Sequence, residues 1–425
     1  MISDRLRAAL PLPFAAFMEE ALYGEGGYYR REALAIGEEG DFVTGSSLSS
    51  LFGRATARLL QRLDGALGGC LERPWHEKKP ASPGPSPPSP LPHALPPPGR
   101  GAPPPKDSQS KERIPPLPGG CECVWEMGLG GEGPGEAGLS RHPLDRPAEL
   151  FEAGYGAGAH LGHVLSSLAE QGSAGRRVRA WDRVARPVPE GAVPVGDLGQ
   201  IEDGTIDGLI FSYELFDALP FHRLIGRADG SVGELWVDHR QNGEDGGFAW
   251  QEGELSDPAL LDLLRDPDVR LQPGQVADLA PGWGPLYAEL ARKLGRGLLV
   301  TCDYGYERER LLDPRVRMHG TLACYSRHRV HRNPFVLVGE QDLTAHVDFT
   351  TLRRTGEAAG LTTFAFTRQA LWLAACGLFE DLQDAPVETR LAAMALLDGE
   401  GMGEDIRVLV QARGIDPAEV MPELR

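Results

Sequence analysis

The chain has 425 residues, with 43 lysines and arginines against 61 aspartates and glutamates, so its formal net charge is −18 at pH 7. This length is enough for two domains, or for one domain with insertions. The acidic balance leaves no broad basic field to neutralise phosphates. It therefore excludes nucleic acid as an expected partner and favours basic proteins or small molecules.

Residues 1–69 are expected to form a helical N-terminal cap. Apolar side chains recur there at helical spacing, a Gly-Gly-Tyr-Tyr turn follows at 26–29, and a second helix is expected from Leu48 to Leu67. Tyr28 and Tyr29 are interpreted as packing residues of this cap that could cover a cofactor. The first residues do not have the pattern of a targeting peptide, and the longest apolar stretch, 370–379, is too short for a membrane span. We expect a cytoplasmic protein without a membrane span.

Residues 70–147 are expected to be a disordered insertion. Seventeen of the 36 prolines lie between Pro74 and Pro118, and such a composition cannot build a core. Cys121 and Cys123 have no second cysteine or histidine pair at zinc spacing, so no metal site is predicted. A glycine-rich stretch at 126–133 competes as a cofactor loop, but no helical pattern follows it.

Residues 148–425 are expected to form an α/β core that begins with the most informative segment of the chain. Glu152 precedes three glycines at alternate positions, Gly154, Gly156 and Gly158, and a helical pattern continues to about residue 169. A strand, a glycine turn and a helix N-terminus form a typical nucleotide-cofactor site. The spacing also fits a dinucleotide fingerprint, but an acidic residue before the first glycine favours the cationic amino-acid end of S-adenosylmethionine.

Further strands are expected at 177–181, 192–195, 206–211 and 297–302, separated by helix-like segments. This alternation predicts a parallel, doubly wound sheet. Residues 221–255 are expected to form an antiparallel excursion, and 260–294 are expected to be mostly helical. An irregular, polar, histidine-rich loop is expected at 320–349.

Acidic residues follow the expected strands, where parallel sheets place their ligands. Asp182 could accept both hydroxyls of a ribose, and Asp197 with the backbone of Leu198 could contact an adenine edge. If the cofactor is S-adenosylmethionine, Glu214 and Asp217 would lie beside its transferring methyl group. Two carboxylates there could orient a guanidinium and disperse its charge, so both are the predicted catalytic residues.

Several stretches together resemble one family of S-adenosylmethionine-dependent methyltransferases. This family includes the mitochondrial complex I assembly factor with protein-arginine methyltransferase activity, and its bacterial relatives. The matching stretches run in the same order over nearly the whole chain outside 70–147, at 14–23, 27–29, 40–44, 51–53, 152–158, 214–220, 303–305 and 342–349.

The resemblance implies a Rossmann-like methyltransferase core, S-adenosyl-L-methionine as cofactor, and arginine methylation of a protein, in the mitochondrial member's case a respiratory-complex partner. It carries the cofactor role to Glu152 with its three glycines and to Asp182. It implies a substrate side built partly from the loop at 320–349, and Asp303, His346 and Asp348 are the candidate residues there. His346 and Asp348 form a polar cluster with His328 and His331, for which structural or substrate-positioning roles are expected rather than catalysis.

The chain departs from the family pattern at two places. Gly45-Ser46-Ser47 replaces Ser-Pro-Glu, and Tyr213 replaces an asparagine before Glu214. These departures keep open a non-catalytic binding or assembly factor with the same fold. An NAD-dependent oxidoreductase stays open through the glycine spacing alone.

Overall fold

The computed structural model describes residues 2–31, 49–68, 147–173, 175–239, 247–397 and 405–424. Contacts divide the chain into two units, one combining Met1–Cys70 with Arg141–Arg425 and the other formed by Leu71–Ser140. All described residues belong to the first unit. The expected insertion (apart from residue 147), the glycine-rich stretch at 126–133, Cys121, Cys123 and the departure at 45–47 lie outside the described residues.

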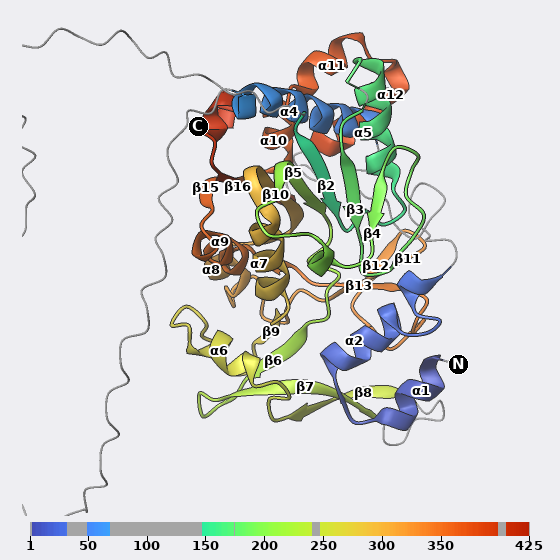
Figure 1. Ribbon diagram of the computed structural model, residues 1–425. Helices are drawn as coiled ribbons and strands as arrows, with labels where there is room; N and C mark the ends of the chain where they lie inside the picture. Colours follow the sequence, from blue (N-terminus) through green and yellow to red (C-terminus); the bar gives the residue numbers. More distant parts are fainter. Residues whose placement is uncertain are drawn as a thin grey trace, which may run out of the picture. The chain divides into compact units, whose positions relative to one another are not determined.

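An eight-stranded sheet forms the centre of the first unit (Figure 1). Its order is β15-β16-β10-β5-β2-β3-β4, and β14 pairs with β10. The strands are β2 (Glu149–Ala153), β3 (Val178–Trp181), β4 (Val193–Val195), β5 (Ile206–Tyr213), β10 (Leu294–Tyr306), β14 (Val347–Asp348), β15 (Thr362–Arg368) and β16 (Ile406–Arg413).

The parallel part of this sheet confirms the predicted doubly wound architecture. Within the run β10-β5-β2-β3-β4, each adjacent pair of strands is parallel. β2 and β5 are adjacent although β3 and β4 lie between them in sequence, which creates a topological switch point beyond their carboxyl ends. β16 and β15 extend the sheet antiparallel at the β10 edge, which the sequence reading did not anticipate.

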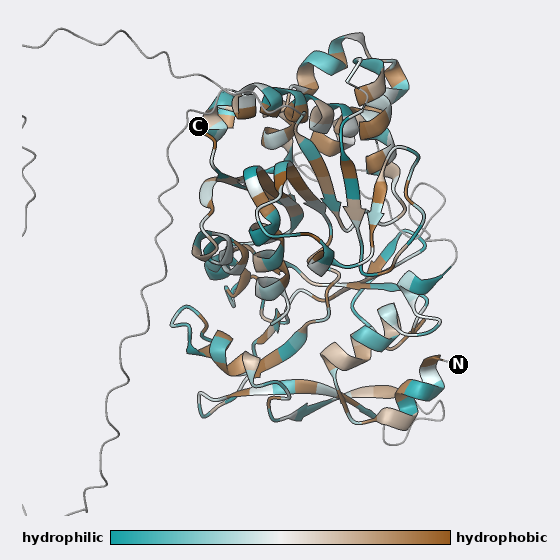
Figure 2. Cartoon of the chain, in the orientation of Figure 1, coloured by the Kyte–Doolittle hydropathy of each residue, from teal (hydrophilic) through white to brown (hydrophobic). Residues whose placement is uncertain are grey.

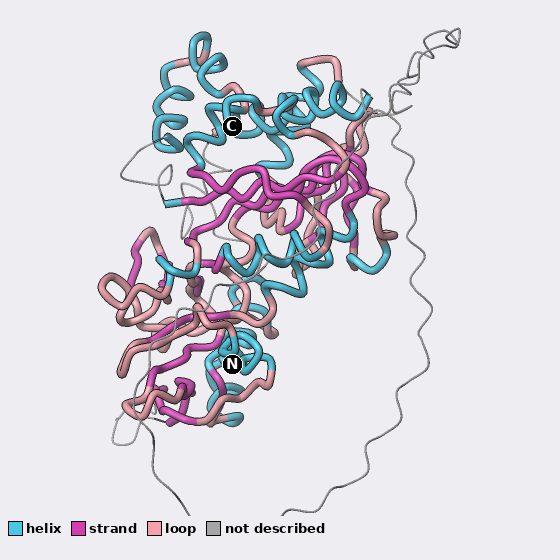
Figure 3. The backbone as a smooth tube through the Cα atoms, turned by 90° about the vertical axis from the view of Figure 1, so that its left-hand side faces the viewer, coloured by secondary structure: helices cyan, strands magenta, loops and turns pink. Residues whose placement is uncertain are grey.

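Both faces of the central sheet are buried. Within β5, Leu209 and Phe211 belong to one hydrophobic cluster and Ile210 belongs to the other, since successive side chains point to opposite faces. The first cluster includes α4 (Ser50–Gly68), α5 (Ala159–Glu170), α10 (Gln369–Ala375) and α12 (Val387–Leu397). The second includes α7 (Trp283–Lys293) and α9 (Phe349–Ala358). Figure 3 shows the sheet between these two helical layers.

A second sheet is antiparallel and carries the N-terminal helices. Its order is β1-β7-β6-β9, with β8 on β7. The strands are β1 (Leu12–Pro13), β6 (His222–Gly226), β7 (Val232–His239), β8 (Phe248–Gly253) and β9 (Val276–Leu279), and the helices are α1 (Ile2–Ala9) and α2 (Phe14–Tyr23). Phe14 and Phe17 of α2 pack against Phe221, Phe248 and Trp250. Figure 2 shows this apolar character on α2.

Two segments differ from the sequence-based expectation. The segment 260–294 contains α6 (Ala259–Arg265) and α7, but β9 lies between them because Val276–Leu279 pairs with β6. The segment 320–349 is not an irregular loop, since β11 (Ala323–Ser326), β12 (Arg329–His331) and β13 (Asp342–Thr344) form a three-stranded sheet.

Short helical elements complete the described chain. They are η1 (Tyr28–Arg30), η2 (Leu198–Gln200), α8 (Arg308–Leu311), α11 (Leu378–Asp384), η3 (Pro417–Glu419) and η4 (Pro422–Leu424). Among the helices in the described ranges, none combines the length and the apolar character that crossing a membrane requires.

Candidate active site

The glycine turn between β2 and α5 forms one wall of a cavity at the switch point. Gly154, Gly156 and Gly158 have φ values of 78°, 53° and 80°, a region that other residues rarely adopt. A Cβ at Gly154 would lie 2.9 Å from Leu215 Cδ1. Conformation and space therefore both explain the glycines, and they bring the backbone against the cavity.

Glu152 is the penultimate residue of β2, just before this turn, and lines the same cavity. Its side chain is buried, and Oε2 lies 3.0 Å from Nδ1 of His160 in α5. Nε2 of His160 lies 3.1 Å from the hydroxyl of Thr56 in α4. This chain of contacts fixes the Glu152 carboxyl, because each partner comes from a packed element.

Asp182 follows β3 and joins its loop to the glycine turn. Its carboxylate accepts hydrogen bonds from the amides of Gly156 at 2.9 Å and Val184 at 3.1 Å. Burial raises the pKa of Asp182 above its ordinary value, and these two amides act in the opposite direction. A carboxylate has about four acceptor positions, so capacity remains for a ligand's hydroxyl groups.

Asp197 and Leu198 line a neighbouring cavity that shares Asp182 and Arg183 with the first. Asp197 is exposed and caps η2 by accepting a hydrogen bond from the Gly199 amide at 2.8 Å. The side chain of Leu198 is buried. From Glu152 through Asp182 to Asp197, the predicted cofactor residues therefore form a continuous series over the two cavities.

Glu214 and Asp217 lie on the loop after β5 and line the first cavity together with the glycine turn. Glu214 has φ of 48°, an uncommon conformation for a residue with a side chain. Asp217 is 4% exposed, and its Oδ1 has no hydrogen-bond partner in the described part of the chain. A buried oxygen of this kind, on the wall of a cavity, is suited to a ligand that donates a hydrogen bond.

Asp303 lies behind this loop rather than among the cavity-lining residues. Its carboxylate in β10 accepts hydrogen bonds from the amides of Phe216 and Tyr304, both at 2.8 Å. It therefore holds the Glu214–Asp217 loop in place. The substrate-side expectation for Asp303 is replaced by a supporting position.

Burial dominates the electrostatics of these acids. Burial, followed by the negative charges of Asp303 and Asp342, raises the pKa of Asp217 well above its ordinary value. Burial raises the pKa of Asp303 to about 8, although the Phe216 amide stabilises its charged form. A cation entering the cavity would restore the charged form of Asp217, because an opposite charge favours ionisation.

Tyrosines and one further acid complete the wall around Asp217. The cavity is lined by Tyr23 and Tyr29 of the N-terminal segment, by Tyr304 and Tyr325, and by Asp342 of β13. The Tyr29 hydroxyl donates to Asp342 at 2.8 Å, and the Tyr23 hydroxyl donates to the Ala218 carbonyl at 2.9 Å. Aromatic rings beside carboxylates are suited to a cationic group.

These lining residues were not predicted as site residues. Asp342 belongs to a stretch that matches the family, but the candidate residues named in that stretch were His346 and Asp348. Tyr29 was interpreted as a packing residue, and only its contact with Asp342 reveals its position on the cavity wall. The signal for both was their place in matching stretches, which does not say where a side chain points.

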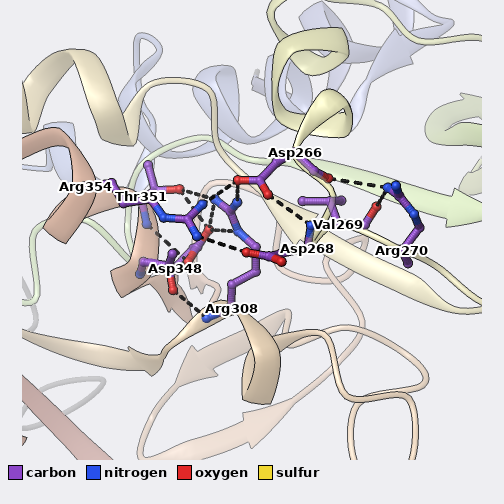
Figure 4. A network of polar contacts seen from close by, with 9 residues as sticks. Asp266, Asp268, Val269, Arg270, Arg308, Asp348, Thr351 and Arg354 are labelled. Atoms are coloured by element: carbon purple, nitrogen blue, oxygen red, sulfur yellow. Dashed lines mark hydrogen bonds and ion pairs between the residues drawn. The ribbon is translucent and has the colours of Figure 1, made fainter. Parts of the chain in front are cut away.

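His346 and Asp348 do not join the cavity. Asp348 caps α9 by accepting from the amides of Thr350 and Thr351, and its carboxylate forms an ion pair with Arg308 at 2.6 Å. Figure 4 shows this network, in which Asp266 also binds Arg308 and Arg354. The contacts of Asp348 are those of a structural residue, which is one of the two roles expected for it. His346 lines a separate cavity, with Arg317 and Arg332.

The residues present fit S-adenosylmethionine chemically. Glu152 offers a carboxylate for an ammonium group, and Asp182 offers acceptors for two ribose hydroxyls. The amides of a glycine turn and helix N-terminus approach any ligand in the cavity. A doubly wound sheet with this site at its switch point defines the class of nucleotide-cofactor-binding α/β proteins.

The chain belongs to the family described as "Putative S-adenosyl-L-methionine-dependent methyltransferase", which matches residues 141–367. It is a methyltransferase whose cofactor is S-adenosyl-L-methionine, and the nicotinamide alternative is thereby set aside. Among curated proteins, it is 24% identical over 375 residues to the Drosophila melanogaster "Protein arginine methyltransferase NDUFAF7 homolog, mitochondrial". That match covers 84% of this chain and 70% of the relative.

Two crystal structures from Burkholderia thailandensis have a similar fold. One, bound to S-adenosyl-homocysteine, gives a TM-score of 0.71 at 22% identity and covers 98% of this chain and 92% of that protein. The other, a native structure from the same superfamily, gives a TM-score of 0.68 at 22% identity and covers 99% and 93%. Both cover nearly the whole of each chain, so the likeness includes the N-terminal elements as well as the central sheet.

Proposed function

We propose that this chain transfers a methyl group from S-adenosylmethionine to an arginine side chain of a partner protein. The observation that carries this proposal is the buried Asp217 carboxyl, whose Oδ1 has no partner in the described ranges and which lies on a cavity wall with Glu214 and Asp342. A guanidinium supplies several N–H donors in a plane and a permanent positive charge, which matches such a wall.

In this proposal the two sides of the cavity have separate roles. Glu152 binds the amino-acid end of the cofactor, the three glycines approach it through their backbone, Asp182 binds the ribose, and Asp197 with Leu198 contacts the adenine. When bound, S-adenosylmethionine supplies an electrophilic methyl group. Glu214 and Asp217 orient the guanidinium and accept the proton that its nitrogen loses.

A protein acceptor is supported by two further facts. The Drosophila relative carries the name of a protein arginine methyltransferase. The net charge of −18 favours association with a basic segment. Tyr23 and Tyr29 come from the N-terminal segment and would enclose the guanidinium from that side.

The test follows labelled methyl groups. The purified protein is incubated with methyl-labelled S-adenosylmethionine and protein extract from cells that lack its gene, and the labelled amino acid is identified after hydrolysis. We expect methylarginine. Label on lysine, or no protein label despite intact binding of S-adenosylhomocysteine, would contradict the proposal, and the second outcome would favour the non-catalytic alternative.

Variants separate the two sides of the site. Asp217→Asn should lower transfer by about a hundredfold or more while S-adenosylhomocysteine binds as before, because it removes a proton acceptor. Glu152→Gln should weaken S-adenosylhomocysteine binding by about 1.5–3 kcal/mol, the range for a hydrogen bond to a charged group. Glu170→Gln, at the exposed end of α5, is the matched control. For all three variants, the labelling assay measures transfer and calorimetric titration measures S-adenosylhomocysteine binding.

A further inference from the structure

A second cavity beside the active site has the opposite charge character. It is lined by residues 314–323 and 330–332 together with His346, and we call it the basic cavity. The segment 314–339 contains five arginines and three histidines without one aspartate or glutamate, in a chain with 61 acidic residues. The basic cavity is therefore a local exception in an acidic protein.

Two arginines of the basic cavity have no carboxylate partner. Arg315 is paired with Asp313, but neither Arg317 nor Arg332 forms an ion pair with any residue that the structure describes. Arg317 is half-buried and Arg332 is exposed, whereas arginines such as Arg176 and Arg223 are buried and paired, with Asp64 and Asp278. The guanidinium of Arg317 lies 4.3 Å from the centre of the Tyr306 ring, which holds it in place without neutralising it.

The mouth of this cavity has the composition of a protein interface. Val316 and Val330 are 66% and 63% exposed, and both line the cavity beside the arginines. Exposed apolar side chains next to arginine are typical of surfaces that bind other proteins. Nδ1 of His346 is buried with no hydrogen-bond partner in the described chain, so the cavity floor also has an unused polar atom.

The basic cavity and the active site share two strands. In the ladder of β11 and β13, Tyr325 pairs with Asp342 and Ala323 pairs with Thr344. Tyr325, Asp342 and Thr344 line the active site, whereas Ala323 and the nearby His346 line the basic cavity. Residues two apart on a strand are separated by about 7 Å, so one extended peptide is long enough to reach both.

We propose that the basic cavity binds an acidic side chain of the protein that is methylated, so that the preferred acceptor is an arginine with a carboxylate residue close to it in sequence, in a partner that is otherwise basic. This inference rests on the proposed function for the acceptor side chain. The cationic side chain enters the wall of acids and tyrosines, while a neighbouring carboxylate meets Arg317 and Arg332. Opposite charges at adjacent sites would fix the direction and register of the peptide.

The experiment measures the affinity of three labelled peptides by fluorescence anisotropy, in the presence of S-adenosylhomocysteine. The first carries one arginine flanked by glutamates, the second has glutamines in place of the glutamates, and the third has citrulline in place of the arginine. The wild type is compared with Arg317→Gln/Arg332→Gln. Arg329→Gln is the matched control, because Arg329 lies on β12 but does not line the basic cavity.

We expect the wild type to prefer the glutamate peptide over the glutamine peptide by about tenfold, a preference that falls with added salt. The double variant should lose this preference and still bind S-adenosylhomocysteine, while Arg329→Gln should keep both. Equal binding of the two peptides by the wild type, or an equal loss in Arg329→Gln, would overturn the inference.

The citrulline peptide separates this inference from the proposed function. If glutamate preference depends on Arg317 and Arg332 but citrulline binds as well as arginine, the basic cavity is supported and the arginine acceptor fails. If citrulline weakens binding but the flanking glutamates have no effect, the arginine acceptor is supported and the role of the basic cavity is overturned.

Discussion

Buried carboxyl groups around one cavity are the main feature at the scale of single residues. Asp217, Asp303 and Asp342 are all nearly inaccessible, and the negative charges of Asp303 and Asp342 disfavour ionisation of Asp217. The unfolded chain has no such constraint, and its aspartates titrate near pH 4. Folding therefore shifts Asp217 and Asp303 toward their protonated forms, and this makes stability depend on pH.

We predict that the free energy of unfolding decreases as pH rises from about 4 to 8. The pKa of Asp303 is raised to about 8, so between these values the folded protein holds a proton that the unfolded chain has released. The stabilisation is complete below about pH 4 and is lost as pH rises through about 8. One such proton gives a slope of up to about 1.4 kcal/mol per pH unit. Urea unfolding across this range measures it.

Asp217→Asn should make that slope shallower, since the pKa of Asp217 is also raised by burial. Asp262→Asn is the control, because Asp262 is exposed on α6 and should leave the slope unchanged. A free energy of unfolding that increases with pH would contradict this account of the buried acids. So would a slope that is identical in Asp217→Asn and the wild type.

At the scale of elements, α4 and α5 approach each other closely at Gly53. A Cβ at this glycine would lie 2.5 Å from the Cβ of His163 in α5. The same contact brings Thr56 of α4 to His160, and His160 to Glu152. Packing between two helices thus supports the carboxyl proposed to bind the cofactor.

Gly53→Ala should therefore destabilise the protein by about 1–3 kcal/mol, the usual cost of overpacking, and should also weaken S-adenosylhomocysteine binding. Gly65→Ala lies on the same helix with nothing within 4 Å of the added carbon. It should stabilise the protein by about 0.5–1 kcal/mol, because alanine is the better helix former. Thermal unfolding and calorimetric titration of both variants measure these effects. Equal stability and equal affinity of the two variants would refute the close approach of α4 and α5 at Gly53.

Local patterns predicted some elements well and others poorly. The helix expected to continue to residue 169 is α5, Ala159–Glu170, and the one expected from 48 to 67 is α4, Ser50–Gly68, because both have strong helical periodicity. β9 and β13 were not predicted, because each is defined by its pairing with a strand elsewhere in the sequence, β9 with β6 and β13 with β11. The antiparallel edge, β15 and β16, also depends on distant pairing.

The candidate site shows the same division. Residues directly after parallel strands, such as Asp182 and Glu214, were placed near one another from the sequence, because topology brings the carboxyl ends of these strands to one edge of the sheet. Asp342 and Tyr29 were not, since their position depends on how the three-stranded sheet and the N-terminal segment pack. For Asp348 the structural and substrate-positioning roles stayed open, because a helix cap and a substrate-binding acid look alike in sequence.

For the whole molecule, the structure brings together the residues on either side of the expected insertion. The Ala148 amide donates to the Asp64 carboxylate at 2.7 Å, and Arg176 binds the same carboxylate. Asp64 belongs to the last turns of α4, and Ala148 directly precedes β2. A short connection can therefore join α4 to β2 without disturbing either.

Deleting residues 72–146 should leave the affinity for S-adenosylhomocysteine unchanged. The free energy of unfolding should be equal or higher, because each halving of a flexible connection lowers the closure cost by about 0.6 kcal/mol. Titration and urea unfolding of the deletion variant provide the measurement. A lost cooperative transition would show that the segment contributes to the core, and Asp64→Ala in the full chain should instead destabilise the protein.

The contact between Tyr29 and Asp342 joins residues that are 313 positions apart. During synthesis, the N-terminal segment must wait until most of the chain has left the ribosome before this wall of the cavity can close. Contacts of such long sequence separation form late and slow the rate of folding. The acceptor side of the cavity should therefore be the last part of the protein to mature, after the cofactor side built by β2, β3 and α5 has formed.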